Sequence, residues 1–397
     1  MINIFKKSIL FKNLLFTLTI VLLYLFLKNI PLSEVRFSLY EEFNFDLDNL
    51  LHMTVGGTRK NYYVMSLGIT PYIVSSLVIQ IILAFKSEKS RSRITQKKIN
   101  QLIVFFSFFI SIFMSALVTY NLDLLDKNLL SYCIAFLELV AGSSFTIWLV
   151  IKNKEKGVGG PSPIIISNII SGLYYQFSDK GTDNIVIIVI ISLFTSLMMI
   201  FMEFKEKRIY IQRVSIHSTL ANKNYLAIKY NPIGVMPIMF SSAFFILLQF
   251  LIYFLLLVFP NSFVLLILKD SLSLTKVFGI LIYLFLLLLL TILFSFIFIN
   301  PSLISEQLLK NGDSIINISV GEQTRKCLNN ELLKHSIISG IVLCFCIGLP
   351  FLLQYNDILD YSLAMVPTSF MVLSGILSNI YQECYAIKCF DSYKKFL

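Results

Sequence analysis

The chain contains long runs of residues without a charged side chain, and these runs restrict its fold more than any other feature. About 20 apolar residues are enough to cross a bilayer, and ten runs approach or exceed that length. In chain order they are 13–27, 61–85, 99–122, 128–151 (interrupted by Glu138), 157–178, 184–202, 230–268, 277–305, 335–356 and 361–382. Only 14% of the residues are charged, against about 25% in a soluble domain. A water-soluble globular enzyme is therefore excluded.

In lipid, the backbone groups of a spanning segment must bond within that segment, so each run is predicted to be a helix. The run 230–268 is long enough for two spans, but Pro260-Asn261 has the composition of a turn. One helix that ends near Val258 agrees better with the charge distribution, and the first helix is expected to begin near Ser8. The predicted fold class is all-α, a polytopic membrane protein with ten transmembrane helices.

Lysine and arginine residues set the predicted orientation, because positively charged loops stay in the cytoplasm. With the N-terminus inside, 25 of the 33 Lys and Arg residues fall in cytoplasmic segments. A pattern shifted by one helix loses this asymmetry. We therefore expect a multi-pass protein of the cytoplasmic membrane with both termini in the cytoplasm. The net charge of +10 follows from this topology and attracts anionic lipid headgroups, and it does not indicate nucleic acid.

Two of the predicted spans contain helix breakers at corresponding positions. Proline removes a backbone donor and clashes with the preceding turn, so the helices with Pro71 and with Pro232 and Pro237 are expected to be kinked or frayed. They are the second span of the first five and the second span of the last five, which is the pattern of two related halves. Because five is odd, the halves must have opposite topology. We predict an N-terminal half, 1–179, and a C-terminal half, 180–397.

Three segments between the spans are distinctive. Segments 204–229 and 301–334 are predicted to be long cytoplasmic loops, which either dock a soluble partner or serve only as solvated connections. Segment 50–58 is apolar but too short to cross. It is expected either to re-enter as a lid or plug inside a cavity, where protein or water covers its backbone, or to form an interfacial turn.

No arrangement of residues has the pattern of a catalytic, cofactor or metal site. Glu138 is the only acidic residue within a span, beside Ala141-Gly142-Ser143-Ser144. An intramembrane carboxylate is a candidate functional group, but without a second charged group we interpret it as a structural hydrogen-bonding group. The glycine-rich stretch 157–160 lacks the Lys-Ser/Thr pair of a P-loop. We expect no enzymatic activity, no cofactor and no bound metal.

Five motifs, in order along the chain, resemble the SecY family, whose members are the central subunits of bacterial protein-conducting channels. They are Gly56-Gly57 followed by Leu67-Gly68-Ile69-Thr70-Pro71-Tyr72-Ile73, Ser75-Ser76 and Gln80; Gly157-Val158-Gly159-Gly160 before Ile164-Ile165-Ile166; Lys207-Arg208-Ile209 with Leu226, Lys229, Asn231, Gly234-Val235 and Pro237; Asn300-Pro301 with Glu306, Leu308, Lys310, Gly312 and Gly321-Glu322-Gln323-Thr324; and Thr368-Ser369. The likeness covers nearly the whole chain. The short, diverged sequence resembles most the accessory SecY paralogue of certain Gram-positive bacteria, which is devoted to serine-rich glycosylated adhesins.

The resemblance implies two inverted five-helix halves around an hourglass pore, with a ring of aliphatic side chains at the waist. Carried over by position, this pore ring comprises Ile69, Ile73, Ile166, Ile170, Met239 and Val372. An apolar ring blocks ions at rest by dewetting. The plug that seals the outer funnel falls on Leu51, Met53, Val55, Gly56 and Gly57. The lateral gate between the second and seventh spans falls on Ser75, Ser76, Gln80, Ser242 and Gln249.

The resemblance also implies partners. They are an accessory SecA-type motor ATPase, SecE-like and SecG-like small membrane subunits, accessory secretion proteins, an unfolded preprotein and membrane lipids. The family has arginines in the eighth loop where this chain has Ser302 and Ser319, which favours a dedicated motor. The remaining basic candidates for motor docking are Lys207, Arg208, Lys310, Arg325 and Lys326.

Two other classes of function remain open at this level. A secondary transporter of a small solute is favoured by intramembrane charge, of which the chain has almost none. A polytopic membrane glycosyl- or acyltransferase needs a polar catalytic cluster at the membrane surface, which the sequence does not display. The sequence therefore favours a passive channel that translocates unfolded preproteins, serine-rich glycosylated adhesins in particular.

Overall fold

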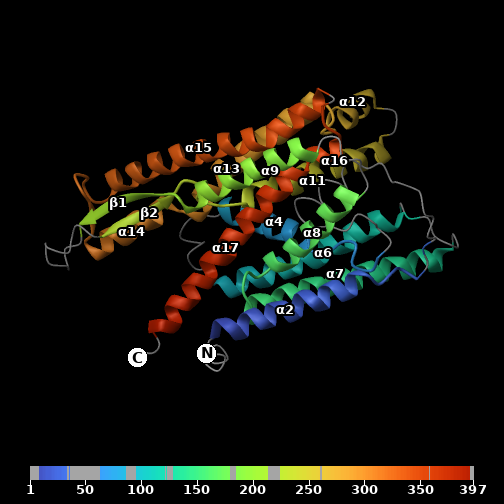
Figure 1. The fold of residues 1–397 in the computed structure, drawn as a ribbon, viewed down its shortest axis with the longest axis horizontal. Helices are drawn as coiled ribbons and strands as arrows, with labels where there is room; N and C mark the ends of the chain where they lie inside the picture. Colours follow the sequence, from blue (N-terminus) through green and yellow to red (C-terminus); the bar gives the residue numbers. More distant parts are fainter. Residues whose placement is uncertain are drawn as a thin grey trace.

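The chain is an elongated bundle of helices with a small β-sheet at one end (Figure 1). The computed structural model describes residues 9–33, 35, 63–85, 95–120, 122, 128–178, 185–212, 224–259, 262–356 and 358–393. The predicted plug residues, Leu51, Met53, Val55, Gly56 and Gly57, lie outside these residues.

The long helices fall into two groups along the chain. The first group comprises α2 (Ile9–Lys28), α4 (Thr70–Phe85), α6 (Gln96–Tyr120), α7 (Leu129–Lys156) and α8 (Ser162–Ser178). The second comprises α9 (Ile185–Phe204), α11 (Met236–Val258), α13 (Val277–Phe298), α15 (Glu322–Tyr355) and α17 (Val366–Tyr393). In the first group α6 packs against α4 and α7, and in the second α17 packs against α9 and α15 against α13. The groups meet where α4 contacts α11 and where α17 contacts α8 and α2.

The helical composition confirms the all-α class of membrane protein. By length and hydropathy, six segments of the described chain qualify as candidate spans: α2, α6, α7, α9, α15 and α13 taken together with the helix that follows it. The apolar segments of helices α4, α8 and α11 are shorter than the 18 residues that a candidate span requires. Each predicted span overlaps one of these ten helices. That all ten cross the membrane stays a prediction.

Several helix ends test the predicted boundaries. Helix α11 ends at Val258, as expected, and the short helix α12 (Phe263–Ser271) follows it. The eighth predicted span, 277–305, is too long, because α13 ends at Phe298. A new helix, α14 (Pro301–Asn311), starts there because Asn300 caps it, with its Oδ1 accepting hydrogen bonds from the backbone N–H groups of Ser302 and Leu303.

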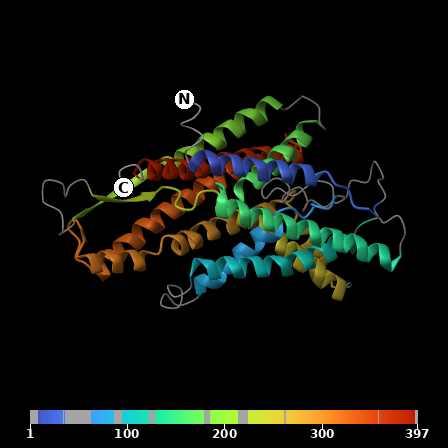
Figure 2. The same ribbon diagram turned by 90° about the horizontal axis from the view of Figure 1, so that it is seen from below.

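The two predicted cytoplasmic loops contain regular structure that the sequence analysis missed. Strands β1 (Glu206–Gln212), β2 (Tyr225–Lys229) and β3 (Ser314–Ile315) form an antiparallel sheet in the order β2-β1-β3. Helix α15 begins at Glu322, before the predicted span 335–356, because its charged first turns continue the same helix. A separate apolar cluster centred on Ile228, Ile315 and Leu328 joins the sheet to α15. Both ribbon views place the sheet and α14 at one end of the bundle and α12 at the other (Figures 1 and 2).

Candidate functional site

Four of the six predicted pore-ring residues are buried in one apolar cluster. Ile69, Ile73, Met239 and Val372 are 0%, 4%, 7% and 0% exposed, and all belong to the main hydrophobic cluster of the bundle. They come from the turn before α4, from α4 itself, from α11 and from α17. Of the two predicted residues on α8, the half-buried Ile166 packs against this cluster, whereas Ile170 is 54% exposed. The structure thus buries the predicted residues of the α4, α11 and α17 segments in the same cluster, and Ile170 does not belong to it.

The start of α4 is set by a turn with a glycine in the left-handed region. Gly68 has a φ of +49°, a backbone angle that residues other than glycine rarely adopt, and α4 begins two residues later. Pro71 occupies the second position of α4, where its missing N–H costs no intrahelical hydrogen bond. The proline expected to kink the span therefore stands at the beginning of the helix.

The start of α11 is built in a similar way. The Asn231 side chain donates to the Gly234 carbonyl oxygen (3.0 Å) and accepts from the Gly234 N–H (3.2 Å). Gly234 has a φ of +72°, and Pro237 is the second residue of α11. The Asn231 N–H also donates to the Met202 carbonyl oxygen on α9 (3.1 Å). This turn therefore fixes where α11 leaves the α9–α17 pair.

The predicted gate residues lie on two helices that contact each other, α4 and α11. Each of three gate serines donates to a carbonyl oxygen three residues earlier: Ser75 to Tyr72, Ser76 to Ile73 and Ser242 to Met239, each at 2.8 Å. Gln249 donates to the Leu272 carbonyl oxygen (2.6 Å), beyond α12. The buried Oε1 atoms of Gln80 and Gln249 accept no hydrogen bond.

The predicted docking cations gather at the sheet end of the bundle, on β1, α14 and α15 (Figure 1). Lys207 pairs with Glu331 of α15, and this hydrogen bond lowers the pKa of the Glu331 carboxyl. Arg208 bonds Glu206 (3.0 Å) and lies over the Tyr225 ring (4.7 Å).

The other three docking cations lie on the two helices beside the sheet. Lys310 approaches Glu306 on α14 (3.7 Å), and Arg325 and Lys326 are exposed on the first turns of α15. Three of the five predicted docking cations are thus paired with glutamates at this end, whereas Arg325 and Lys326 are exposed on a folded helix.

Glu138, the intramembrane carboxylate of the sequence, is a hydrogen-bond acceptor for the turn after α2. Its Oε1 accepts from the Ser33 hydroxyl (2.6 Å) and its Oε2 from the Ser33 N–H (3.1 Å). These contacts agree with the structural interpretation of this residue.

The glycine-rich turn between α7 and α8 is held by two side chains. Asn153, which is 0% exposed, donates to the carbonyl oxygens of Val158 (3.2 Å) and Gly160 (2.6 Å). From α17, Glu383 accepts a hydrogen bond from the Gly159 N–H (2.9 Å). The turn is thus tied both to the end of α7 and to the second group of helices.

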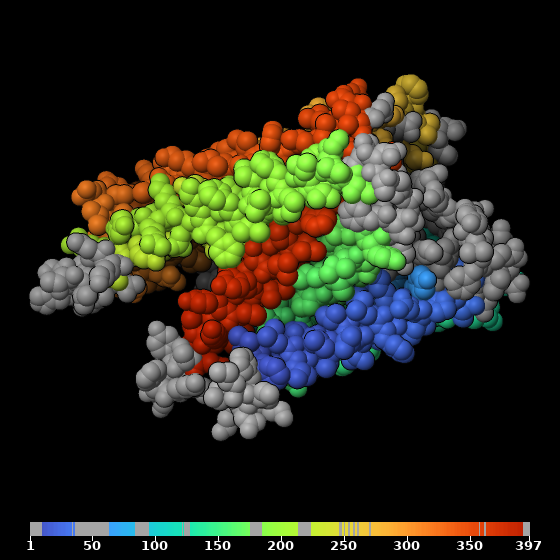
Figure 3. Space-filling model, in the orientation of Figure 1, coloured from blue at the N-terminus to red at the C-terminus, as the bar shows by residue number. Residues whose placement is uncertain are grey.

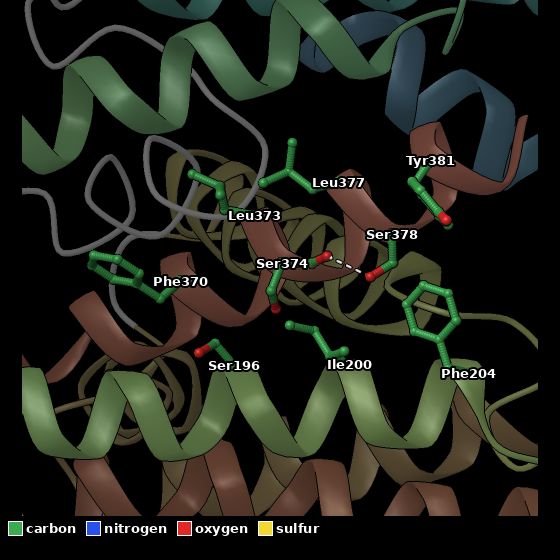
Figure 4. A pocket seen from close by; sticks show the side chains of 9 residues that line it. All are labelled: Ser196, Ile200, Phe204, Phe370, Leu373, Ser374, Leu377, Ser378 and Tyr381. Atoms are coloured by element: carbon green, nitrogen blue, oxygen red, sulfur yellow. Dashed lines mark hydrogen bonds between the residues drawn. The ribbon is translucent and has the colours of Figure 1, made fainter. Parts of the chain in front are cut away.

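An apolar groove between α9 and α17 was not predicted. The two helices run side by side on the face in Figure 3. The residues that line the groove are Ser196, Ile200, Phe204, Phe370, Leu373, Ser374, Leu377, Ser378 and Tyr381 (Figure 4). The Ser378 hydroxyl is already used, because it donates to the Ser374 carbonyl oxygen (2.9 Å). The signal in the sequence is the spacing Ser196, Ile200, Phe204, which repeats every four residues on one helix face.

Comparisons with known proteins agree with this architecture. The family model described as SecY matches residues 63–381. The chain is 25% identical over 403 residues to an "Accessory Sec system protein translocase subunit SecY2" of Streptococcus agalactiae, covering 99% of this chain and 97% of that protein. It is 25% identical to a "Protein translocase subunit SecY" of Staphylococcus carnosus, over 94% of each chain. A solved structure titled "The structure of a protein conducting channel" superposes with a TM-score of 0.69 at 12% identity, covering 96% of this chain and 93% of the other.

Proposed function

The chain belongs to the SecY family, and we propose that it is the membrane channel subunit through which an accessory Sec system exports unfolded preproteins. The proposed substrates are serine-rich glycosylated adhesins. In the proposed orientation, the sheet end faces the cytoplasm and both chain termini lie in the cytoplasm. The observation that carries the proposal is the burial of Ile69, Ile73, Met239 and Val372, from three different helical segments, in one apolar cluster. Apolar side chains exclude ions when they meet, and they make no strong contact with a passing chain of varied sequence.

The push comes from a soluble motor ATPase that docks at the sheet end. The basic groups of β1, α14 and α15 support this assignment, since they lie on folded elements rather than on solvated loops. A folded surface holds its charges in fixed positions, so the exposed Arg325 and Lys326 can pair with an acidic partner at a low entropic cost.

The groove between α9 and α17 is the proposed seat of a small single-span subunit. Its lining is apolar apart from three serines and the Tyr381 hydroxyl, and small hydroxyl residues allow close approach of a second helix in a membrane. Replacing Ser374 with Trp fills the groove and is expected to abolish co-purification of the small subunit. Leu281→Trp, on a residue of α13 that is 59% exposed, is the matched control and should not affect it. Co-purification unchanged in Ser374→Trp would place the subunit elsewhere.

Ion leak through vesicles that contain the purified channel tests the pore ring. Ile73→Gly removes a buried ring residue and is expected to raise the leak above that of the unmodified channel. Phe113→Gly makes a comparable change at a residue that is 54% exposed on α6, and it should leave the leak unchanged. Ile170→Gly tests whether the exposed member of the set contributes. An Ile73→Gly channel as tight as the unmodified one would refute the ring.

A further inference from the structure

Three residues of α7 contact two segments of the chain, the segment that follows α2 and the turn that leads into α4. Glu138, Gly142 and Thr146 are spaced four apart, so they lie on one face of the helix. Glu138 bonds Ser33, whereas Gly142 and Thr146 face the turn formed by residues 64–69. One face of α7 therefore holds two chain segments that are distant in sequence.

Thr146 is the polar contact to this turn. Its side chain is 0% exposed, and its hydroxyl lies 2.8 Å from the Gly68 carbonyl oxygen and 2.7 Å from the Ser143 carbonyl oxygen. The backbone hydrogen bonds of the turn are accepted by the carbonyl groups of Tyr63, Met65, Leu67 and Ile69. The Gly68 carbonyl faces α7, where the Thr146 hydroxyl contacts it.

Gly142 is the steric contact. A Cβ atom at this position would lie 2.0 Å from the carbonyl oxygen of Val64 and 2.7 Å from its carbonyl carbon. These are backbone atoms, so no side-chain rotation relieves the overlap. Any residue larger than glycine must push the turn away from α7.

The turn is also closed against the end of α2. The Val64 N–H donates to the Ile30 carbonyl oxygen (3.0 Å), and Pro31 and Tyr63 form an antiparallel bridge. Because Glu138 holds Ser33, this bridge connects the two segments that α7 contacts. The face of α7 and the bridge together fix the turn in three places.

We propose that Gly142 and Thr146 are positioning residues for the pore ring. Ile69 follows Gly68 directly and Ile73 lies one helical turn further, so the position of the turn on α7 sets where both side chains enter the central cluster. Glu138 supports the same turn from the α2 side. This inference rests on the proposed function, because it gives the two residues a role in sealing the channel at rest.

Ion leak in vesicles with the full-length channel tests the inference. Thr146→Val keeps the shape of the side chain and removes the hydroxyl. It is expected to raise the resting leak about threefold, the shift in an opening equilibrium for a lost intramembrane hydrogen bond of about 0.6 kcal/mol. Thr146→Ser restores the hydroxyl and should restore the seal. Gly142→Ala is a second variant that acts through sterics, and its leak should rise as well.

Two controls separate this inference from the function on which it rests. Ser144→Ala removes a hydroxyl that bonds the Ala141 carbonyl oxygen (2.9 Å) away from the turn, and it should not change the leak. Ile73→Gly tests the ring itself. The positioning role alone is overturned if the Thr146→Val or the Gly142→Ala channel stays tight while the Ile73→Gly channel leaks. It is also overturned if the Thr146→Ser channel leaks as much as the Thr146→Val channel. A tight Ile73→Gly channel overturns the ring and the positioning role with it.

Discussion

A single methyl group on α17 is predicted to disturb the start of α11. A Cβ atom added at Gly375 would lie 1.9 Å from Cγ2 of Val235 and 2.9 Å from Cε of Met199. Val235 is 2% exposed, and it belongs to the turn from which α11 departs. The methionine can bend away, because its side chain is flexible. The branched valine in a packed site cannot, so Gly375→Ala must displace the turn.

The size of the effect follows from two opposing contributions. Overpacking a filled core costs about 1–3 kcal/mol, while replacing glycine with alanine inside a helix favours folding by up to about 1 kcal/mol. We therefore expect Gly375→Ala to reduce the free energy of unfolding by about 1–2 kcal/mol. Gly348→Ala on α15 is the matched control. Its Cβ would lie 3.2 Å from Cδ1 of Leu284, the end of a flexible side chain, so this variant should be neutral or more stable.

Equilibrium unfolding of the purified channel in mixed micelles, with rising denaturing detergent, measures the difference. Val235→Ala is then combined with Gly375→Ala to complete a double-mutant cycle. If the overlap is the cause, removal of the valine methyl groups restores part of the lost stability, and the two changes are not additive. Strictly additive changes, or a Gly375→Ala channel as stable as the unmodified one, would refute the steric argument.

Two further predictions concern Asn153 and Glu331. Asn153→Ala is expected to destabilise the channel by about 2 kcal/mol, since it leaves the carbonyl groups of Val158 and Gly160 without their donor. Asn153→Asp should be destabilised as well in the same unfolding assay, because an ionised carboxylate cannot donate a hydrogen bond. An Asn153→Asp channel as stable as the unmodified one would contradict this. Because the pKa of Glu331 is lowered in the folded protein, its pairing with Lys207 stabilises the sheet end at pH values above the ordinary Glu pKa of about 4.3. This stabilisation is lost as the pH falls through the lowered pKa. The protection factors of the β1 amides, which are exchange rates corrected for the intrinsic pH dependence, should therefore fall as the pH drops through the lowered Glu331 pKa. Glu331→Gln should remove this loss of protection. The effect is small because the Lys207 side chain is 44% exposed.

The pattern of apolar runs was sufficient to predict the class of fold, and the motifs were sufficient to predict the family. The end of α11 at Val258 followed from a proline turn and a charge count. The eighth span was predicted too long because an apolar run does not mark where a helix restarts, and the signal was Asn300 followed by Pro301. The sheet was not predicted because its strands are short and lie in segments that were interpreted only from their positive charge, as cytoplasmic loops. The alternation of polar residues with Ile209 and Ile211 was the available indication.

Contacts between distant parts of the chain lay beyond prediction from the sequence. Glu138 was identified as a hydrogen-bonding residue, but Ser33 is 105 positions away, and no local pattern pairs them. The separation of Ile170 from the other predicted ring residues likewise depends on how α8 is rotated in the bundle. Helical spacing determines which residues share a face, and tertiary packing determines what that face meets.

Photo-crosslinking of a stalled preprotein tests the central claim most directly. The claim is that an unfolded chain passes through the part of the apolar cluster that contains Ile73, Met239 and Val372. A photoreactive amino acid is placed in turn at Ile73, Met239, Val372 and, as a lipid-facing control, Phe113. Crosslinks are expected from the first three positions, only while translocation is under way, and none from Phe113. Crosslinks that are absent from the three buried positions, or equally strong from Phe113, would contradict the claim.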